Sequence, residues 1–455
     1  MFKKCALAAA LGLVAAGTAH AQTDLSRLQN VPAANTLFIS GASAPRSLIV
    51  GAGTDAVCNT GTKRIFRQDQ STGLGANTLR LYGILCNGNA NSGASGQDIA
   101  IYYSPIGSLW GVTPVRRGLA VPRLNLANCP ASGATSDTAN CTTGSALPTQ
   151  AVPDAGVSDL SKNIVAIAPN VPTTADIDAE FVTAGIIGSA TRASMALPLS
   201  TAERASLTEK ATGGTIFGVQ VNQALRDALI SRTGTYTTSV TDGGTTYAVL
   251  SKAEISSLML TGNPAAADAA ALLGVPAGDF TLCRRLTGSG TQAVANAYFL
   301  NNPTSAAVQG GAGFATNADD SAGTPSAYDV QEAVASSDVA TCMGGAGYRM
   351  GILSIENAAP TGGGYLAING VAPTKANVRN GVYDYYSEQV LLQNGLSGSK
   401  LAIFNALDNN ALSTQAICSN GAAMVLPGVT VSVANTNCQM RSSRNGNQGG
   451  VNARR

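Results

Sequence analysis

The chain has 455 residues, of which 28 are lysine or arginine, 26 are aspartate or glutamate and a single one is histidine. A formal net charge of +2 without a run of basic residues disfavours a surface that binds nucleic acid or an anionic membrane. Hydrophobic residues make up 45% of the chain, which is ample for a folded core, and the length favours two or more domains or one two-lobed body.

Residues 1–21 are typical of a secretory signal peptide, with two lysines, a short apolar run and small residues before the expected cleavage after Ala21. We therefore expect a periplasmic or secreted protein of the Gram-negative type. The single histidine, His20, is removed with this segment, so the mature chain cannot use a Ser-His-Asp or Cys-His mechanism and lacks the commonest metal ligand. We expect no metal, no cofactor and no nucleic-acid partner.

Eight cysteines remain after cleavage, and an even number in an exported chain indicates disulfides. Their connectivity cannot be proved from sequence, but pairing neighbours closes the shortest loops. This rule predicts bonds between Cys58 and Cys86, Cys129 and Cys141, Cys283 and Cys342, and Cys418 and Cys438. The absence of a C-x-x-C spacing disfavours redox catalysis and zinc binding.

The first half of the chain begins with a predicted strand that ends in a glycine-rich turn, followed by a helix. Pro45 in the turn suits a first helical position. From about 58 to 153 the chain is polar and rich in glycine, with two strand-like pieces and a surface loop over 124–153. The expected elements are strand Asn35–Ser40, helix Ser47–Val57, strands Thr78–Leu85 and Ile99–Tyr103, and a buried strand Ile164–Ala168.

Strands and helices alternate in the second half. The helix that starts at Ser251 has a capping box in which Glu254 is the partner residue. The other expected elements are strands Thr215–Val221, Asp279–Cys283 and Tyr348–Ile355, helix Asn222–Ser231, a strand and turn over Leu366–Gly370, and a strand followed by a helix over Gly381–Leu392. This alternation predicts mainly parallel α/β sheets.

The segment Arg285–Thr291, with the sequence Arg-Leu-Thr-Gly-Ser-Gly-Thr, runs directly into a predicted helix, Gln292–Leu300. A Ser-Gly-Thr triplet at a helix start offers backbone N–H groups and two hydroxyls, and the helix dipole adds partial positive charge. Arg285 adds a planar fork of donors. These parts suit a tetrahedral oxyanion such as phosphate or sulfate. The alternative is an ordinary Ser or Thr cap beside a surface arginine.

Further segments carry motifs in a recognisable order. They are Gly41–Arg46, Tyr103–Val112, Gly156–Asp159, the capped helix after Leu250, Gly351–Ser354 and Asn380–Tyr383. Together with Arg285–Thr291 they resemble the periplasmic phosphate-binding proteins of ABC uptake systems, in the type II periplasmic-binding superfamily. The similarity covers about half of the mature chain in scattered blocks.

This resemblance implies a two-lobed α/β fold with a hinge and, in this chain, disulfide-stapled loop insertions over about 55–153. It implies a first lobe over 22–214, a second lobe over 215–364, and a return to the first lobe over 365–455.

The resemblance also implies a set of oxyanion-binding residues: Ser108, Asp159, Arg285, Ser289, Gly290 and Thr291. Asp159 would accept the proton of a protonated phosphate and so select phosphate over sulfate; the alternative for it is a helix-cap or turn aspartate. The chain departs from the family pattern at Pro45-Arg46, where a Thr-Phe pair is expected. Proline in place of threonine removes a hydroxyl and a backbone N–H donor. Arg46 either compensates with its charge or lies in solvent.

The function implied by the resemblance is capture of a small oxyanion, with phosphate as the expected ion, by a monomeric solute-binding protein that works with an ABC permease and is not an enzyme. An alternative is an exported or surface structural or interaction protein that keeps this scaffold without a transport role. A hydrolase using Ser289 or Ser108 is disfavoured, because the mature chain lacks histidine and has no Ser-x-x-Lys pair in a matching context.

Overall fold

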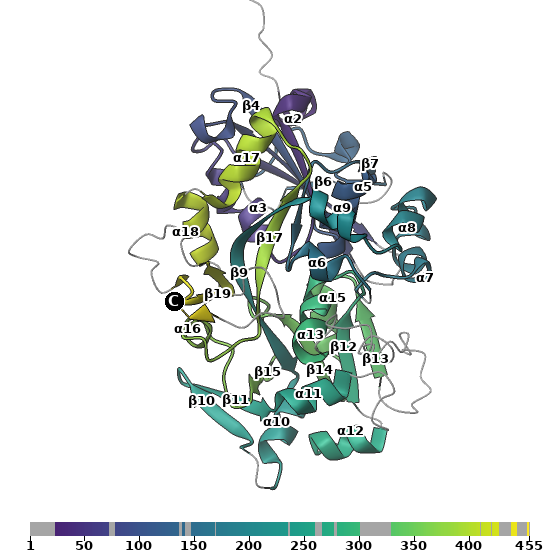
Figure 1. Ribbon diagram of the computed structural model, residues 1–455, viewed down its shortest axis with the longest axis vertical. Helices are drawn as coiled ribbons and strands as arrows, with labels where there is room; N and C mark the ends of the chain where they lie inside the picture. Colours follow the sequence, from purple (N-terminus) through teal and green to yellow (C-terminus); the bar gives the residue numbers. More distant parts are fainter. Residues whose placement is uncertain are drawn as a thin grey trace, which may run out of the picture.

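Two lobes share one long sheet, which runs from the top to the bottom of the molecule (Figure 1). The computed structural model describes residues 23–71, 78–135, 139–141, 147–168, 170–234, 237–259, 266–276, 280–300, 329–409, 411–419, 421–426, 438–443 and 453–454. The expected signal peptide, residues 1–21, lies outside the described residues. The main sheet has the strand order β13-β12-β14-β9-β17-β8-β1-β4-β3-β2-β6.

The first lobe is built on a parallel core of three strands, which antiparallel strands extend on both sides. The core strands are β1 (Thr36–Gly41), β4 (Asp98–Ser104) and β8 (Ala155–Ser158). The strands beyond β4 are β3 (Thr78–Asn87), β2 (Arg64–Ser71) and the short β6 (Asn140–Cys141).

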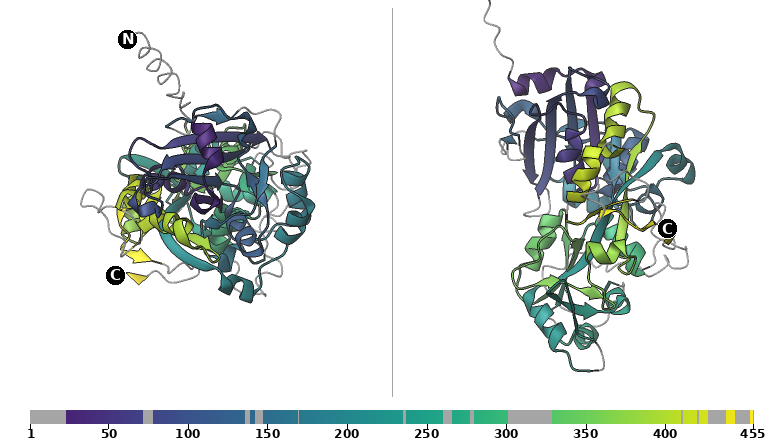
Figure 2. Two further views of the ribbon diagram at one scale, coloured as in Figure 1. Left: turned by 90° about the horizontal axis from the view of Figure 1, so that it is seen from above. Right: turned by 90° about the vertical axis from the view of Figure 1, so that its left-hand side faces the viewer.

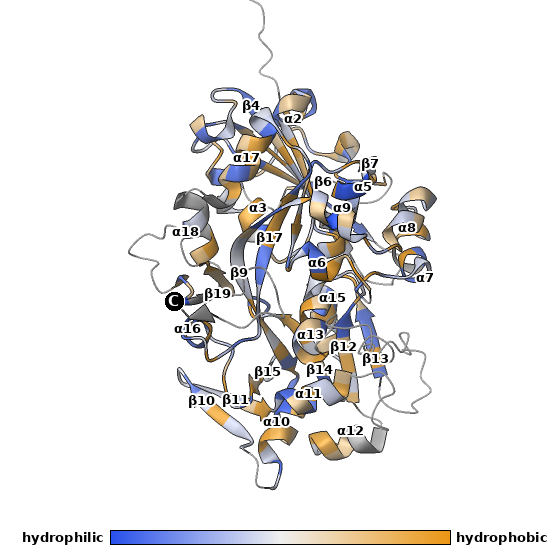
Figure 3. Cartoon of the chain, in the orientation of Figure 1, coloured by the Kyte–Doolittle hydropathy of each residue, from blue (hydrophilic) through white to orange (hydrophobic). Residues whose placement is uncertain are grey.

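The second lobe repeats this plan with a parallel core in which β12 lies between β13 and β14. These strands are β12 (Phe280–Arg285), β13 (Asp329–Ala333) and β14 (Tyr348–Ser354). The edge strand β13 is largely hydrophilic in Figure 3, as suits an exposed sheet edge.

Two strands join the lobes. The long strand β9 (Thr208–Val221) pairs with β17 (Tyr386–Gln393) as far as Ile216 and with β14 from Phe217 onward. Figure 2 shows the strands of the first lobe, in purple and blue, above the teal and green strands of the second. The predicted two-lobed α/β fold is therefore present.

Helices cover both faces of the first lobe. On one face lie α3 (Arg46–Ile49), α4 (Ala52–Asp55), α17 (Gly398–Asn409) and α18 (Ala411–Ser419). The other helical segments of this lobe are α2 (Asp24–Asn30), α5 (Thr113–Arg117), α6 (Lys162–Val165), α7 (Thr174–Ile177), α8 (Ser189–Met195) and α9 (Thr201–Ser206), with short turns η1 (Ala33–Asn35), η2 (Ala90–Ser92), η3 (Ser108–Gly111), η4 (Leu126–Asn128) and η5 (Asp178–Val182).

The remaining elements lie mainly in the second lobe and at the C-terminal end. The helices are α10 (Gln223–Ser231), α11 (Lys252–Met259), α12 (Ala266–Leu273), α13 (Gly290–Leu300), α15 (Ser336–Met343) and α16 (Lys375–Arg379). The short strands are β5 (Val121–Arg123), β7 (Thr149–Ala151), β10 (Ser239–Asp242), β11 (Thr245–Leu250), β15 (Gly364–Tyr365), β16 (Ala367–Ile368), β18 (Ala423–Val425), β19 (Ser442–Ser443) and β20 (Ala453–Arg454).

The core of the first lobe follows the alternation of its strands. Leu37 and Ile39 of β1 pack with Phe404 and other apolar residues of α17, whereas Phe38 between them faces the opposite side of the sheet. Both faces are therefore buried, as is usual for parallel strands covered by helices. None of the helices in the described part of the chain combines the length and the apolar character that crossing a bilayer requires.

All four predicted disulfides are present, each between neighbouring cysteines of the chain: Cys58 with Cys86, Cys129 with Cys141, Cys283 with Cys342, and Cys418 with Cys438. The third bond joins β12 to α15 in the second lobe. It therefore fixes the start of the segment after β12 relative to α15.

Several predicted elements are wrong, and each error has a local cause. Ile164–Ala168 does not form a strand: its first two residues end α6, whose N-cap is Ser161, because a short apolar run alone does not distinguish strand from helix. The helix predicted at the end of Gly381–Leu392 is instead the buried strand β17. The helix predicted over Ser47–Val57 is split into α3 and α4 around Gly51.

The close approach of β8 to η3 predicts that a larger residue at position 156 destabilises the protein. A Cβ on Gly156 would lie 1.7 Å from the carbonyl oxygen of Gly111, so Gly156→Ala forces two backbones apart. We expect it to lower the free energy of unfolding by about 3 kcal/mol, measured by urea denaturation. The control Gly344→Ala, whose nearest contact would be 3.4 Å away, should leave stability unchanged or slightly raised; equal losses for both variants would contradict this account.

Candidate functional site

The predicted oxyanion-binding residues come from loops at the carboxyl ends of parallel strands in both lobes. Ser108 follows β4, Asp159 follows β8, and Arg285 is the last residue of β12. Carboxyl ends of parallel strands meet at one edge of a sheet, where ligand sites of α/β proteins usually lie. In this molecule the two edges face each other where the lobes meet.

Ser108 and Asp159 form a buried pair that the start of α13 touches directly. The Ser108 hydroxyl donates to Oδ2 of Asp159 at 3.2 Å, and the Asp159 N–H donates to Oγ of Ser108 at 3.0 Å. A Cβ on Gly290 would lie 2.0 Å from Oγ of Ser108 and 2.4 Å from Oδ2 of Asp159. The backbone of Gly290 therefore fills the space that an oxyanion would need between this pair and α13.

Arg285 lies buried beside this contact and is held by the segment between β13 and α15. Its Nε donates to the carbonyl of Ala333 at 3.3 Å, its Nη1 donates to Oγ of Ser336 at 3.2 Å, and its Nη2 donates to the carbonyl of Val334. These acceptors orient the guanidinium without an acidic residue at position 287, where the sequence has threonine. Arg285 is thus a fixed positive charge at the contact between the lobes.

Two opposing effects set the protonation of Asp159. Burial raises the pKa of its carboxyl from 3.8 to about 6, and the carboxylate of Glu356 adds to this rise. The charge of Arg285 and the hydroxyl of Ser108 lower the pKa but do not cancel the rise. The side chain of Gln389 also hydrogen-bonds to this carboxyl and lowers its pKa. The carboxyl therefore gains a proton in mildly acidic solution.

The first turns of α13 are docked on loops of the first lobe. Ser289 and Thr291, at the start of this helix, are each 5% exposed. Nearby, the N–H of Leu109 donates to the carbonyl of Gly288 at 3.1 Å, and Nδ2 of Asn296 donates to Oδ1 of Asn170 at 2.9 Å. The predicted residues thus form a closed contact between the lobes.

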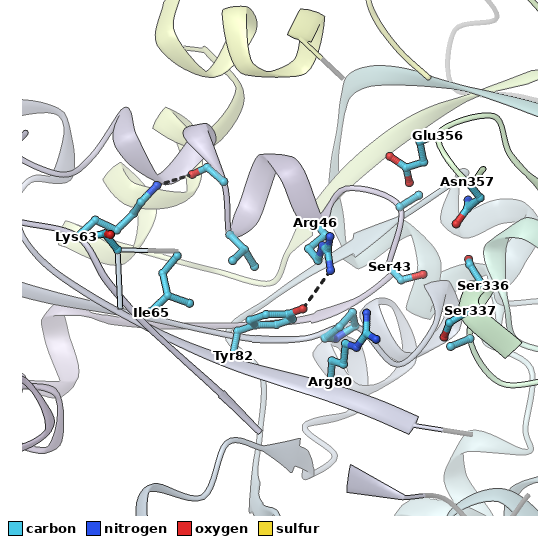
Figure 4. A pocket seen from close by; sticks show the side chains of 16 residues that line it. Ser43, Arg46, Lys63, Ile65, Arg80, Tyr82, Ser336, Ser337, Glu356 and Asn357 are labelled. Carbon is cyan, nitrogen blue, oxygen red and sulfur yellow. Dashed lines mark hydrogen bonds between the residues drawn. The ribbon is translucent and has the colours of Figure 1, made fainter. Parts of the chain in front are cut away.

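A cleft of about 610 Å³ opens beside this contact and is lined by residues of both lobes (Figure 4). Of the predicted site residues, it is Arg46 that lines the cleft. The sequence analysis missed the other charged and hydroxyl-bearing residues of its walls: Ser43, Lys63, Arg80, Tyr82 and Thr135 from the first lobe, and Ser336, Ser337 and Glu356 from the second.

The cations on one wall are held to different degrees. Arg46 is exposed and donates to the hydroxyl of Tyr82 at 3.4 Å. Lys63 is paired with Asp55 at 2.6 Å. Arg80 lies 4.0 Å from Asp69, at the outer limit of an ion pair, and its side chain is 42% exposed. Arg80 is therefore the cation of this wall that an anion can engage at the smallest cost in broken contacts.

The opposite wall presents the start of α15, where Ser336 and Ser337 are the first two residues. The N-terminal end of a helix carries partial positive charge. Ser336 also accepts a hydrogen bond from Arg285, so it links the buried contact to the cleft. Asp338 adds a negative charge to this wall when it is ionised. Burial raises the pKa of its carboxyl, whereas the charges of Arg285 and Arg80 lower it. Cations and hydroxyls thus face each other across the cleft.

Comparisons with known proteins show similarity of fold at low sequence identity. No family model and no curated protein matches the chain. A Clostridium perfringens protein whose crystal structure contains bound phosphate is 11% identical, with 85% of this chain and 98% of that chain covered and a TM-score of 0.45. An ABC-type phosphate transport receptor from Vibrio cholerae is 12% identical, with the same coverage and a TM-score of 0.43. PstS from Borrelia burgdorferi is 10% identical, covers 88% and 100%, and has a TM-score of 0.38.

The raised pKa of Asp159 predicts a pH-dependent stability difference. Between about pH 4 and 6 the folded chain binds the proton more tightly than the unfolded chain, so ionisation of Asp159 costs stability as the pH rises. A shift of about two pKa units corresponds to about 3 kcal/mol. Asp159→Asn lacks this cost, and its free energy of unfolding relative to wild type should rise by about that amount from pH 4 to pH 7 in urea titrations.

A matched control is Glu203→Gln. Its carboxyl has a pKa lowered to about 2, because Arg117 and the N-cap Ser200 hydrogen-bond to it, so its stabilising effect is complete above pH 5. This variant should be less stable than wild type by a constant amount from pH 5 to 7. A pH-independent difference for Asp159→Asn would show that the buried carboxyl does not carry the proton assigned to it.

Proposed function

We propose that this chain is an exported solute-binding protein that takes an oxyanion, with inorganic phosphate as the first candidate, between its two lobes and passes it to an ABC permease. The observation that carries this proposal is the cleft, in which Arg46 and Arg80 on one lobe face the N-terminal end of α15 on the other. Binding would draw opposite walls together around one charge.

The proposal includes a hinge at the two connecting strands. With lobes over 22–214 and 215–364, and a return segment over 365–455, β9 and β17 are the strands that bend when the cleft opens. The contact of Gly290 with Ser108 and Asp159 then marks the closed arrangement. A few strand residues that absorb backbone rotation are sufficient for such a motion.

In the open arrangement the predicted residues acquire their role in binding. Separation of α13 from Ser108 would expose the N–H groups of the first helical turn and the hydroxyls of Ser289 and Thr291 to an entering anion. Asp159 would then accept the proton of a protonated phosphate, while Arg285 supplies positive charge. In the closed arrangement the carboxyl of Asp159 itself lies next to this helix start.

The proposal predicts ligand-dependent thermal stability. A ligand at one hundred times its Kd stabilises the folded state by about 2.7 kcal/mol, so the melting temperature of the mature protein should rise with phosphate concentration. Arg80→Gln removes a cation of the cleft and should weaken binding about tenfold. Differential scanning calorimetry measures the melting temperature, and isothermal titration calorimetry measures the affinity.

The control is Arg192→Gln in α8, which removes an arginine of similar exposure that is paired with Asp178 outside the cleft. Its affinity should equal that of wild type. Loss of affinity in both variants would indicate a general effect of net charge and would contradict a role for the cleft.

The direct contact of Gly290 with Ser108 and Asp159 favours a second candidate function. The lobes pack directly on each other there, as a structural or interaction protein on the same scaffold would require. Two results together would distinguish this second function. Phosphate, sulfate and their esters would leave the melting temperature unchanged, and deletion of residues 124–150 would abolish partner binding.

A further inference from the structure

We propose that the solute of the cleft is a hydroxylated ester of phosphate, with a charged head and an organic body, and not the free inorganic ion. This inference rests on the proposed function and specifies the class of ligand. Three observations carry it: the size of the cleft, the contact that fills the predicted oxyanion site, and an acidic acceptor at the edge of the cleft.

The cleft is much larger than a free oxyanion. Its volume is about 610 Å³, within the range of about 300–1,000 Å³ that is typical of pockets for organic ligands. One water molecule takes a share of about 30 Å³ in the liquid, so an ion with four oxygens would leave most of the cleft to solvent. Water around the ion would weaken its attraction to Arg46 and Arg80. A ligand with an organic body excludes that water.

The smaller site cannot serve the free ion in this arrangement of the lobes. Gly290 packs against Ser108 and Asp159, and the carboxyl of Asp159 already occupies the position next to the helix start. An anion in the closed protein therefore has to bind in the cleft, where Arg80, Ser336 and Ser337 offer donors. We place the phosphate head between these residues.

Glu356 specifies what the rest of the ligand must offer. Its carboxylate lines the same cleft and accepts a hydrogen bond from the hydroxyl of Ser354 at 3.3 Å. A carboxylate accepts hydrogen bonds and repels an anion, so the phosphate head has to lie away from it. A hydroxyl of the organic body can donate to Glu356 at any pH, whereas a phosphate oxygen can do so only when it is protonated.

The walls of the same cleft also contain apolar atoms that suit the body of an ester. Ala44, Val50, Ile65 and Pro105 line the cleft together with the ring of Tyr82. Tyr82 is fixed by its contact with Arg46 and by stacking on Tyr103, with 6.2 Å between ring centroids. The cleft thus offers cations, apolar contact and a hydrogen-bond acceptor to one ligand.

Calorimetric titration of the mature protein with glucose 6-phosphate, glycerol 3-phosphate, inorganic phosphate and glucose tests the inference. We expect at least one of the two esters to bind at least tenfold more tightly than inorganic phosphate, and glucose to bind at least tenfold more weakly than that ester. If neither ester binds at least tenfold more tightly than inorganic phosphate, and phosphate itself binds, the inference is overturned and the proposed function stays intact. If none of the four compounds binds, the proposed function fails with it. Glucose that binds as tightly as the ester would show that no charged head is recognised.

Variants of Glu356 test the assigned contact. Glu356→Ala removes the acceptor and a negative charge, so it should weaken ester binding and strengthen phosphate binding, which lowers the ratio of the two affinities about tenfold. Glu356→Gln keeps a carbonyl acceptor in the same place and should retain part of the ratio, which guards against loss of folding in the alanine variant. An unchanged ratio in both variants would overturn the placement of the organic body.

Discussion

A buried carboxyl lies where the two lobes touch, and the rest of the site depends on it. Asp159 is 3% exposed, bonded to Ser108 and covered by the backbone of Gly290. Burial favours its neutral form and Arg285 favours its ionised form, so the balance between them fixes the energy of this contact. A side chain at position 290 would separate the lobes, because its Cβ would overlap both partners.

The contacts of Arg285 connect the interface between the lobes with the start of α15, which lines the cleft. The guanidinium is held by Ser336 and by carbonyls of the segment before α15. The disulfide between Cys283 and Cys342 joins the strand that carries Arg285 to the same helix. Because β12 and α15 are crosslinked, the buried charge and the helix start that faces the cleft cannot move independently. In the opening proposed above, Arg285 and the start of α15 would therefore move together.

The sequence predicted the fold and the disulfides better than it predicted the shape of the site. Neighbouring cysteines pair because short loops cost little entropy to close, and the strands of the parallel cores are apolar runs that local patterns reveal. The strand β2 escaped prediction because its residues are mostly polar and its partner β3 is selected by tertiary contact. Arg80 lies within the predicted strand Thr78–Leu85, but local patterns do not reveal that it and Lys63 line a cleft. Likewise, a Ser-Gly-Thr motif indicates a helix start but not how closely Gly290 approaches Asp159.

In the proposed binding, the contact at Gly290 closes the lobes and the cleft selects the solute. A single small oxyanion site would combine these two tasks. In the closing motion proposed above, the carboxyl of Asp159 itself supplies the acceptor next to α13 and Arg285, so a small ion would contribute little to the free energy of closing at this contact. Selectivity then has to arise where charges and hydroxyls still face solvent, at Arg80 and the start of α15. A solute that spans from these donors to Glu356 contacts both lobes at separate points. It therefore contacts the second lobe at one more point than an ion held between Arg80 and the start of α15.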